Sequence, residues 1–590
     1  MFNLKNTLLV ASLCPFLISS SWAKNGVEII YLNGKIYTAK DHTPLQQAIA
    51  VSDEGTILKV GNNADIRKLA DADTKIVDLQ QKVLMPGLID THIHALISGV
   101  ESVMATMEEG EISVPAVVEK LKVTQKDGTA VYGDVLVLNG LSSEYWELED
   151  QLSAVFNHNE WKNKPIALVG SDHHTAWANQ AMLKKAGVDK KFVRQLVAED
   201  QQNIRHNKKF EPTGFLVDSG WDVVSEKIPS VPHDLMYKGS KKAVQELNQL
   251  GITAWLDIAS NASPLQGIFN IKNTENTIGV IPMYKELSEK GELTARVSGL
   301  HIINSKSTAQ VLDTLEVINN QYKNIENFNL IGMKVFADGI LEYPAQSAAL
   351  IGQYSNSKKN GQLLFDPAVF KILVDEADKR NMLVHIHAIG DRAVHESLNA
   401  IEYARAKRQS HVAHTITHLQ LVDPKDYDRF KQNDVIASMQ LAWAYEDGFN
   451  KTLVKPYISQ ASYQGMYPAG SLVKHGATLA GASDAPVSTP NPFIAMSIGM
   501  TRIAEDGDYL NKKEAIDRET AFKAYTVNAA QALGREKEIG TLEVGKKADM
   551  IVLDRDIFTV SPEQLAETKV VWTIFNGKKS INNRRVDCKC

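Results

Sequence analysis

The chain has 590 residues and a mass of 65.2 kDa, which is more than one ordinary hydrophobic core accommodates. Its composition is 44% hydrophobic and 23% charged, and its formal net charge is −6, values typical of a soluble globular protein. They exclude the overall basic footprint of a nucleic-acid-binding protein and favour a small-molecule substrate, while homo-oligomerisation is left open.

The first 23 residues have the pattern of a secretory signal peptide. Lys5 precedes an almost wholly apolar run at 7–18, and Ser21 and Ala23 place small residues at the −3 and −1 positions of a cleavage site. The run is short for a membrane span, although an uncleaved anchor is the alternative. We predict cleavage after Ala23, export to the periplasm or the medium, and no stable membrane insertion of the mature chain.

Cysteine is scarce, which limits the kinds of site that the chain can build. Cleavage would remove Cys14 and leave Cys588 and Cys590, in a terminal segment that we expect to be a flexible tail. Two such residues cannot form a disulfide framework or a cysteine-rich zinc site. Any metal ion must therefore be held by His, Asp, Glu or a less usual ligand.

Two β-rich segments flank the long middle of the chain. Short β-type runs and turns alternate from 27 to 83, with Asn33 and Gly34 as a hairpin signal. The runs at 548–556 and 570–580 have the same character. We predict one small β-sandwich that residues 24–85 and 535–590 form together.

The middle, 86–534, alternates apolar β-branched runs with helical stretches, the pattern of βα units around a parallel sheet. The predicted fold is therefore α/β, a (β/α)8 TIM-type barrel. The stretch at about 98–241 is too long for one crossover, and we interpret it as an insertion after the first strand that roofs the site. The eight candidate strands lie at 87–94, 251–259, 295–303, 330–339, 382–390, 414–422, 434–440 and 477–487.

Chemistry in such barrels is found at the carboxyl ends of the strands. His92 and His94 are two residues apart, so both imidazoles project from one face of a strand, which suits a metal site but also a hydrogen-bonded core pair. Other strand ends add further donors, and together they could bind two divalent ions. The candidate ligands are His92, His94, Lys334, His387, His418 and Asp484.

This ordered set resembles the amidohydrolase superfamily, specifically the amidohydrolase family 3 group that includes N-substituted formamide deformylases. The resembling segments cover most of the mature chain. Thr417 departs from the family where an acidic residue commonly precedes the sixth-strand histidine, and Leu441 stands where proline is frequent. The segments are LMPGLIDTHIH, IGMKVFADG, VHIHAIGDRAV, HTITHLQ, GASDAPV and AYTVNAAQALGREKEIGTLEVGKKADMIVLD.

The resemblance implies two divalent ions: one held by His92, His94 and Asp484, the other by His387 and His418. Zinc is expected from nitrogen and oxygen ligands, with manganese, iron or cobalt as alternatives.

Lys334 is the bridging ligand that the resemblance implies. An ammonium group has no lone pair, so the lysine can bridge two cations only as a carbamate formed with CO2. The alternative is a plain salt bridge between Lys334 and Asp338.

Two further histidines, His385 and His414, are expected to support the site without binding metal. His385 shares a face with His387 but lies one layer deeper, so packing or support of a ligand is expected. His414 precedes His418 by four residues and could fix a ligand's tautomer through an outer hydrogen bond.

Within the insertion, the segment SDHHTAWANQAML resembles a family segment whose histidine and asparagine face the active site, here His174 and Asn179. Trp177 could stack on a substrate. The alternative is a helix N-terminus capped by Thr175 or Asp172, with Trp177 in the core.

The predicted activity is hydrolysis of a carbon–nitrogen bond in an amide, formamide or related molecule by a metal-activated water. Asp484 would take a proton from that water and pass it to the departing amine. One alternative is a mononuclear deaminase of the same superfamily, against which Lys334 argues. Another is a non-catalytic binding or regulatory protein on the same fold.

Overall fold

The structure is a computed structural model that describes residues 26–108, 110, 112–503 and 507–582. The predicted signal peptide at 1–23, together with Cys588 and Cys590, lies outside these residues. Among the helices that are described, none has the length and apolar composition of a membrane span.

Eight parallel strands form the central sheet, which confirms the predicted barrel. Seven candidate runs contain one of them, and the run at 330–339 overlaps β16, which begins two residues earlier; neighbours in the sheet follow one another along the chain among these eight strands. The strands are β7 (Leu88–Ile93), β14 (Ile252–Asp257), β15 (Arg296–Ile302), β16 (Phe328–Phe336), β17 (Leu383–Ala388), β18 (Thr415–His418), β19 (Ile436–Met439) and β20 (Thr478–Gly481).

The last and first strands meet, so the sheet closes on itself near the predicted ligands. The backbone N–H of Asp484 donates to the carbonyl oxygen of His92 at 2.8 Å, and that of His94 donates to Ala485 at 3.1 Å. The Thr91 hydroxyl donates to the Gly481 carbonyl at 2.9 Å. These bonds tie the segment after β20 to the end of β7.

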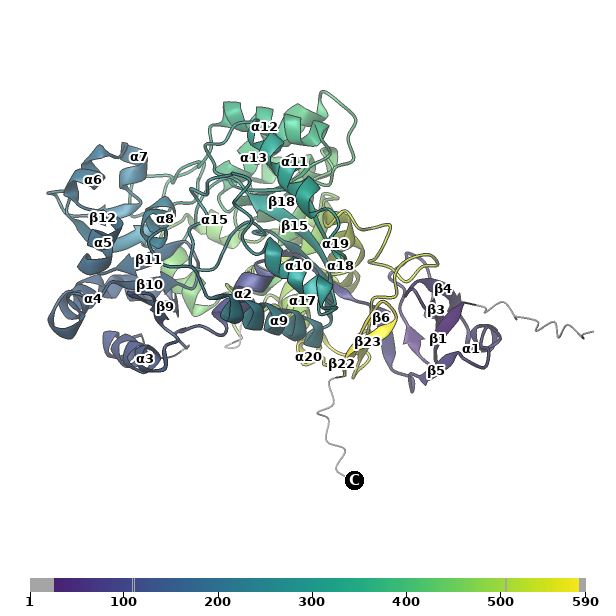
Figure 1. Ribbon diagram of the computed structural model, residues 1–590. Helices are drawn as coiled ribbons and strands as arrows, with labels where there is room; N and C mark the ends of the chain where they lie inside the picture. The colour runs from purple at the N-terminus through teal and green to yellow at the C-terminus, as the bar shows by residue number, and fades with distance from the viewer. Residues whose placement is uncertain (1–25, 109, 111, 504–506, 583–590) are drawn as a thin grey trace, which may run out of the picture.

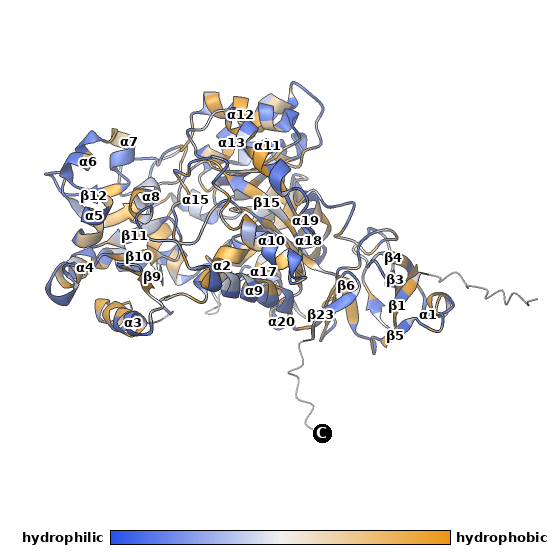
Figure 2. Cartoon of the chain, viewed as in Figure 1, coloured by the Kyte–Doolittle hydropathy of each residue, from blue (hydrophilic) through white to orange (hydrophobic). Residues whose placement is uncertain are grey.

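Amphipathic helices cover the outside of the barrel. In α12, Phe370, Leu373, Val374 and Ala377 are buried at spacings of three and four residues, and orange and blue alternate along its ribbon in Figure 2. The larger helices are α2 (Ala95–Glu101), α9 (His233–Gln249), α10 (Ile281–Glu289), α11 (Val311–Tyr322), α12 (Pro367–Lys379), α13 (Asp391–Arg405), α17 (Pro492–Thr501), α18 (Arg518–Ala524) and α19 (Val527–Ala532).

Both ends of the chain contribute to a sandwich beside the barrel (Figure 1). One sheet has the order β4-β3-β1-β5, and the other, β2-β6-β21-β22-β23, joins β6 to β21 in antiparallel register. Apolar residues from both ends, including Ile49, Leu84 and Val552, share one core. The strands are β1 (Val27–Leu32), β2 (Lys35–Ile36), β3 (Ala48–Ser52), β4 (Ile57–Gly61), β5 (Lys75–Asp78), β6 (Val83–Pro86), β21 (Met550–Leu553), β22 (Val570–Phe575) and β23 (Lys578–Asn582).

The insertion after β7 builds its own sheet on the side of the barrel away from the sandwich (Figure 1). The order of this sheet is β12-β13-β11-β10-β9-β8. It contains β8 (Val131–Tyr132), β9 (Val135–Leu141), β10 (Ile166–Gly170), β11 (Thr175–Ala178), β12 (Ile204–His206) and β13 (Pro212–Val217), with α3 (Val114–Asp127), α4 (Glu149–Phe156), α5 (Gln180–Ala186) and α8 (Ser219–Ser225) around it.

Candidate metal centre

The six predicted ligands all lie at the carboxyl ends of barrel strands. His92 and Lys334 are within β7 and β16, His387 and His418 are at the ends of β17 and β18, and His94 and Asp484 follow β7 and β20. All except His94 are buried, and the His94 side chain is 14% exposed.

His92, His94 and Asp484 form the tightest group of donors. Both Nε2 atoms approach the same carboxylate oxygen, Oδ1 of Asp484, at 3.1 Å from His92 and 3.4 Å from His94. One donor atom from each residue lies within 4.8 Å of the others, and in the described part of the chain no second group of three His, Cys, Asp or Glu residues does so.

The protonation of this group suits a cation. Burial, followed by the charges of Lys334 and His94, holds the pKa of His92 well below its usual range, so the ring is neutral. Burial alone would raise the pKa of Asp484, but the hydrogen bond from His94 and the nearby His418 outweigh it and lower that pKa. A neutral imidazole beside a carboxylate is the ligand state that a divalent ion requires.

His387 and His418 lie beside this group, with ring centroids 4.5 Å apart. His387 donates through Nε2 to the carbonyl oxygen of Gly339 at 3.0 Å, and His418 donates through Nδ1 to Oε1 of Gln440 at 3.1 Å. Each ring therefore keeps its other nitrogen as an acceptor, which orients it as metal-binding histidines usually are.

Lys334 is buried next to these histidines, and its Nζ lies 4.9 Å from the centre of the Phe336 ring. Among the described residues no ion pair joins it to Asp338, whose carboxylate instead accepts backbone N–H groups of Ala349, Ile389 and Gly390. The alternative salt bridge is thus not formed. Burial lowers the pKa of Lys334 to about 7, against the opposing charge of Asp484, so much of the amine is neutral near neutral pH.

His385 contacts His92 and orients its ring. Its Nε2 lies 2.7 Å from Nδ1 of His92, and its other ring nitrogen is hydrogen-bonded to the Thr415 hydroxyl. This chain of contacts fixes the His92 ring through the nitrogen that faces away from Asp484.

His414 does not act on the centre, which corrects the expected outer-shell role. It precedes β18, so it lies at the opposite end of the strand from His418. Its Nδ1 accepts the Val384 N–H at 3.1 Å, and its Nε2 lies 3.1 Å from the Asp378 carboxylate. These contacts stabilise the amino ends of the strands.

The insertion brings His174 to the centre. Its ring centroid lies 5.3 Å from that of His387, and its Nδ1 is 2.7 Å from Oδ1 of Asp218. Burial lowers the pKa of His174, but the hydrogen bond and charge of Asp218 outweigh it, and the pKa is raised.

Trp177 and Asn179 do not face the centre, which corrects that part of the prediction. The segment is strand β11 rather than a helix start, and Trp177 is fully buried against Phe156 in the core of the insertion. Asn179 caps α5 by accepting the Met182 N–H, and its amide donates to the Lys164 carbonyl. Both side chains hold the insertion together.

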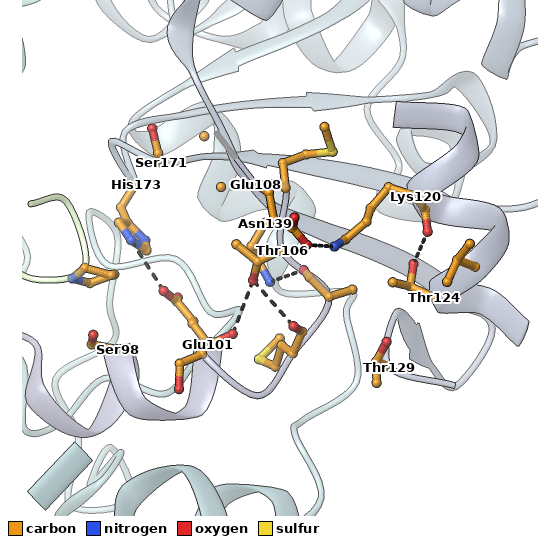
Figure 3. Close-up of a pocket in the computed structure, with 18 of the residues that line it drawn as sticks. Ser98, Glu101, Thr106, Glu108, Lys120, Thr124, Thr129, Asn139, Ser171 and His173 are labelled. Carbon is orange, nitrogen blue, oxygen red and sulfur yellow. Dashed lines mark hydrogen bonds and ion pairs between the residues drawn. The ribbon is translucent and has the colours of Figure 1, made fainter. Parts of the chain in front are cut away.

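Sequence reasoning missed three residues at the centre: Asp218, His173 and Glu101. The His173 ring lies 6.4 Å from that of His94, and its Nε2 is 3.5 Å from the Glu101 carboxylate (Figure 3). The adjacent histidines of SDHHTAW were the available signal, and they lie in the turn before β11, where His173 has a φ of 57°. Here His173 reaches the His94 side and His174 the His387 side.

The donor set fits a divalent transition-metal ion. Imidazole nitrogens and one carboxylate are ligands that such ions accept, and buried partners already orient three of the rings. The Nε2 atoms of His92 and His94 converge on one carboxylate oxygen, and these are the atoms that would hold a cation there.

The chain is similar to known proteins over most of its length. A sequence model of the amidohydrolase family matches residues 75–580. Protein LONG AFTER FAR-RED 3 of Arabidopsis thaliana is 26% identical over 568 residues, which cover 94% of this chain and 91% of that protein. N-substituted formamide deformylase of Arthrobacter pascens is 23% identical over 564 residues, 93% of this chain and 97% of the deformylase.

A solved structure shares the fold. The crystal structure of an uncharacterized metal-dependent hydrolase from Pyrococcus horikoshii OT3 superposes with a TM-score of 0.68 at 22% identity. The superposition covers 90% of this chain and 99% of the other.

Proposed function

Because the chain belongs to the amidohydrolase family, we propose that it is a metal-dependent hydrolase that cleaves a carbon–nitrogen bond in a non-peptide amide, a formamide or a related small molecule. The convergence of His92, His94 and Asp484 on one point at the end of the barrel is the observation that carries this proposal. The likeness to a formamide deformylase supports the choice of bond.

In this proposal His92, His94 and Asp484 hold one divalent ion, and His387 and His418 hold a second. Lys334 would be their shared ligand as a carbamate, and its lowered pKa supports this because CO2 adds only to a neutral amine. Such ions, when bound, would supply a water of lowered pKa and would polarise a carbonyl group. Zinc is the proposed metal, with manganese, iron and cobalt as alternatives.

Asp484 is the proposed proton carrier. Its two oxygens have different neighbours: Oδ1 faces His92 and His94, while Oδ2 lies 3.9 Å from Nδ1 of His418. One oxygen can therefore stay engaged while the other accepts a proton from the attacking water and returns it to the leaving nitrogen.

His174 is the proposed donor to the substrate carbonyl. Its Nδ1 donates to the Asp218 carboxylate, so Nε2 donates a hydrogen bond when the ring is protonated, and the raised pKa of His174 favours that form. A donor fixed before the reaction stabilises developing negative charge on the oxygen without further reorganisation.

The test combines metal analysis with a substrate panel. We would strip the full chain with a chelator, reload it, and measure hydrolysis of formamides, other amides and esters. The proposal expects turnover of a formamide or amide only after reloading. Full metal content without any turnover would favour a binding protein, and ammonia release from an aminated heterocycle would favour a deaminase.

Export is part of the proposal. N-terminal sequencing of the protein from its native cell should find Lys24 first, because cleavage is expected after Ala23. An intact Met1 on cytosolic protein would contradict it.

A further inference from the structure

A cavity of about 580 Å³ lies where α2, α3 and the insertion sheet meet (Figure 3). We call it the α2 cavity. Its lining includes Ser98, in the helix that begins right after His94, and Pro486, in the segment that begins with Asp484. The cavity thus borders both arms of the His-His-Asp group.

Three side chains stand between the α2 cavity and His94. A second cavity of about 40 Å³ is lined by His94 and shares Glu101, Asn139 and His173 with the larger one. A molecule that reaches from His94 into the α2 cavity must pass these residues.

Glu101 is the least satisfied charge on this route. Its side chain is 12% exposed, and within the described residues its one ion-pair partner is His173, at 3.5 Å. By contrast, the Asp127 carboxylate accepts both the N–H and the hydroxyl of Thr129. Burial raises the pKa of Glu101, because a secluded carboxylate lacks the donors that water would supply.

The positive charge in the cavity is already paired. Lys120 lies 2.9 Å from the Glu108 carboxylate, and Figure 3 shows this pair apart from Glu101 and His173. A ligand anion would have to displace Glu108, whereas a ligand N–H would meet an under-occupied carboxylate at Glu101.

We propose that the α2 cavity binds the non-reacting chain of the substrate and that Glu101 selects chains that end in an amine or another N–H donor. This inference rests on the proposed function, because it takes the bond at the metal centre to be the one cleaved. The substrate class is therefore an amide or formamide with a cationic or N–H-bearing substituent.

The experiment uses two matched series on the metal-loaded full chain. In one, formamides carry on nitrogen an unbranched alkyl chain that ends in a methyl, an ammonium or a carboxylate group. In the other, the same three chains stand on the acyl carbon of simple amides. In at least one series, kcat/KM should be about tenfold or more higher for the ammonium chain than for the methyl chain, and lowest for the carboxylate.

Glu101→Gln should lower the ratio of kcat/KM for the ammonium chain to kcat/KM for the methyl chain to about one, whatever the rate for the methyl chain itself. The matched control is Glu289→Gln, an exposed glutamate on α10, which should leave the whole pattern unchanged. Lys120→Met tests the opposite assignment and should not abolish any preference.

The outcomes separate the two proposals. Hydrolysis of the methyl chain without any ammonium preference overturns the assignment of Glu101 but leaves the hydrolase intact, even if Glu101→Gln does not fold. A carboxylate preference that Lys120→Met removes also overturns it. No turnover of any member by metal-loaded protein refutes the hydrolase itself.

Discussion

The candidate ligands form two groups at the same end of the barrel, and different kinds of contact hold the two groups in place. His92, His94 and Asp484 converge within 4.8 Å, and backbone bonds between the segments after β7 and β20 hold them there. His387 and His418 are instead oriented one by one, through Gly339 and Gln440, and each has a different carboxylate farther away: Asp338 at 3.6 Å from His387 and Asp484 at 3.9 Å from His418. One carboxylate oxygen thus joins the first group, whereas the proposed second ion would depend on a further ligand shared with the first.

The largest effect should come from breaking the first group. His92→Ala should lose bound metal and reduce kcat/KM by more than about 100-fold, because loss of a direct ligand exceeds the loss of an outer partner. Metal analysis and kinetics on the same sample measure both. His475→Asn, on the protein surface, is the control, and a fully metallated active His92→Ala enzyme would contradict the assignment.

The second group depends on Lys334. Lys334→Met fills similar space without an amine, so bound metal should fall from two ions to one and activity should drop about 100-fold. A short carboxylic acid should partly restore activity by supplying bridging oxygens. NMR of protein prepared with isotopically labelled CO2 tests for the carbamate, and two bound ions without any carbamate would rule the bridge out.

Asp218 should matter through His174. Asp218→Asn should lower kcat about 10-fold to 100-fold with a smaller change in KM, because the His174 ring loses the partner that fixes it. In a His174→Ala background the same change should have no further effect on kcat. An equal additional loss in that background would show that Asp218 acts elsewhere.

Smaller effects are expected from changing His385 or His414, two buried histidines. His385→Gln should weaken metal affinity about tenfold, since His385 holds the His92 ring. His414→Gln should leave metal affinity unchanged and lower the free energy of unfolding by about 1–3 kcal/mol, because the buried Val384 N–H loses its acceptor and Asp378 loses one of its partners. Metal titration and denaturant unfolding of both variants distinguish support of the centre from support of the barrel.

The sequence was sufficient for the barrel because runs rich in apolar and β-branched residues alternate with helical stretches, and the candidate ligands were found by asking which polar residues stand where each run ends. His92 and Asp484 are 1% and 7% exposed, in keeping with side chains that point into the barrel's carboxyl end.

Contacts between loops that are far apart in the sequence could not be predicted from where the strands end. Asp218 follows His174 by 44 positions, and nothing in its local pattern marks it as a partner. Asn179 was expected at the site from the family resemblance alone, whereas Trp177 had two possible positions, and the structure has it in the core, as the alternative stated. The helix of that alternative begins later, after Asn179, because a short apolar run does not distinguish a strand from a helix start.

The sandwich cannot be completed until the strands at the C-terminal end of the chain have been synthesised. The Tyr31 hydroxyl donates to the carbonyl oxygen of Gly577, 546 positions later, so the first strands cannot complete their core until nearly the whole chain exists. At ribosomal rates this takes about half a minute to two minutes. During that time β1, β3, β4 and β5 can pair with one another, but β6 lacks its neighbour β21 and the first sheet lacks the sheet that packs on it. A chain that stops short of β21 would expose Leu84 and its neighbours as an apolar surface open to aggregation. The apolar residues near the N-terminus are therefore buried only when the C-terminal strands are present.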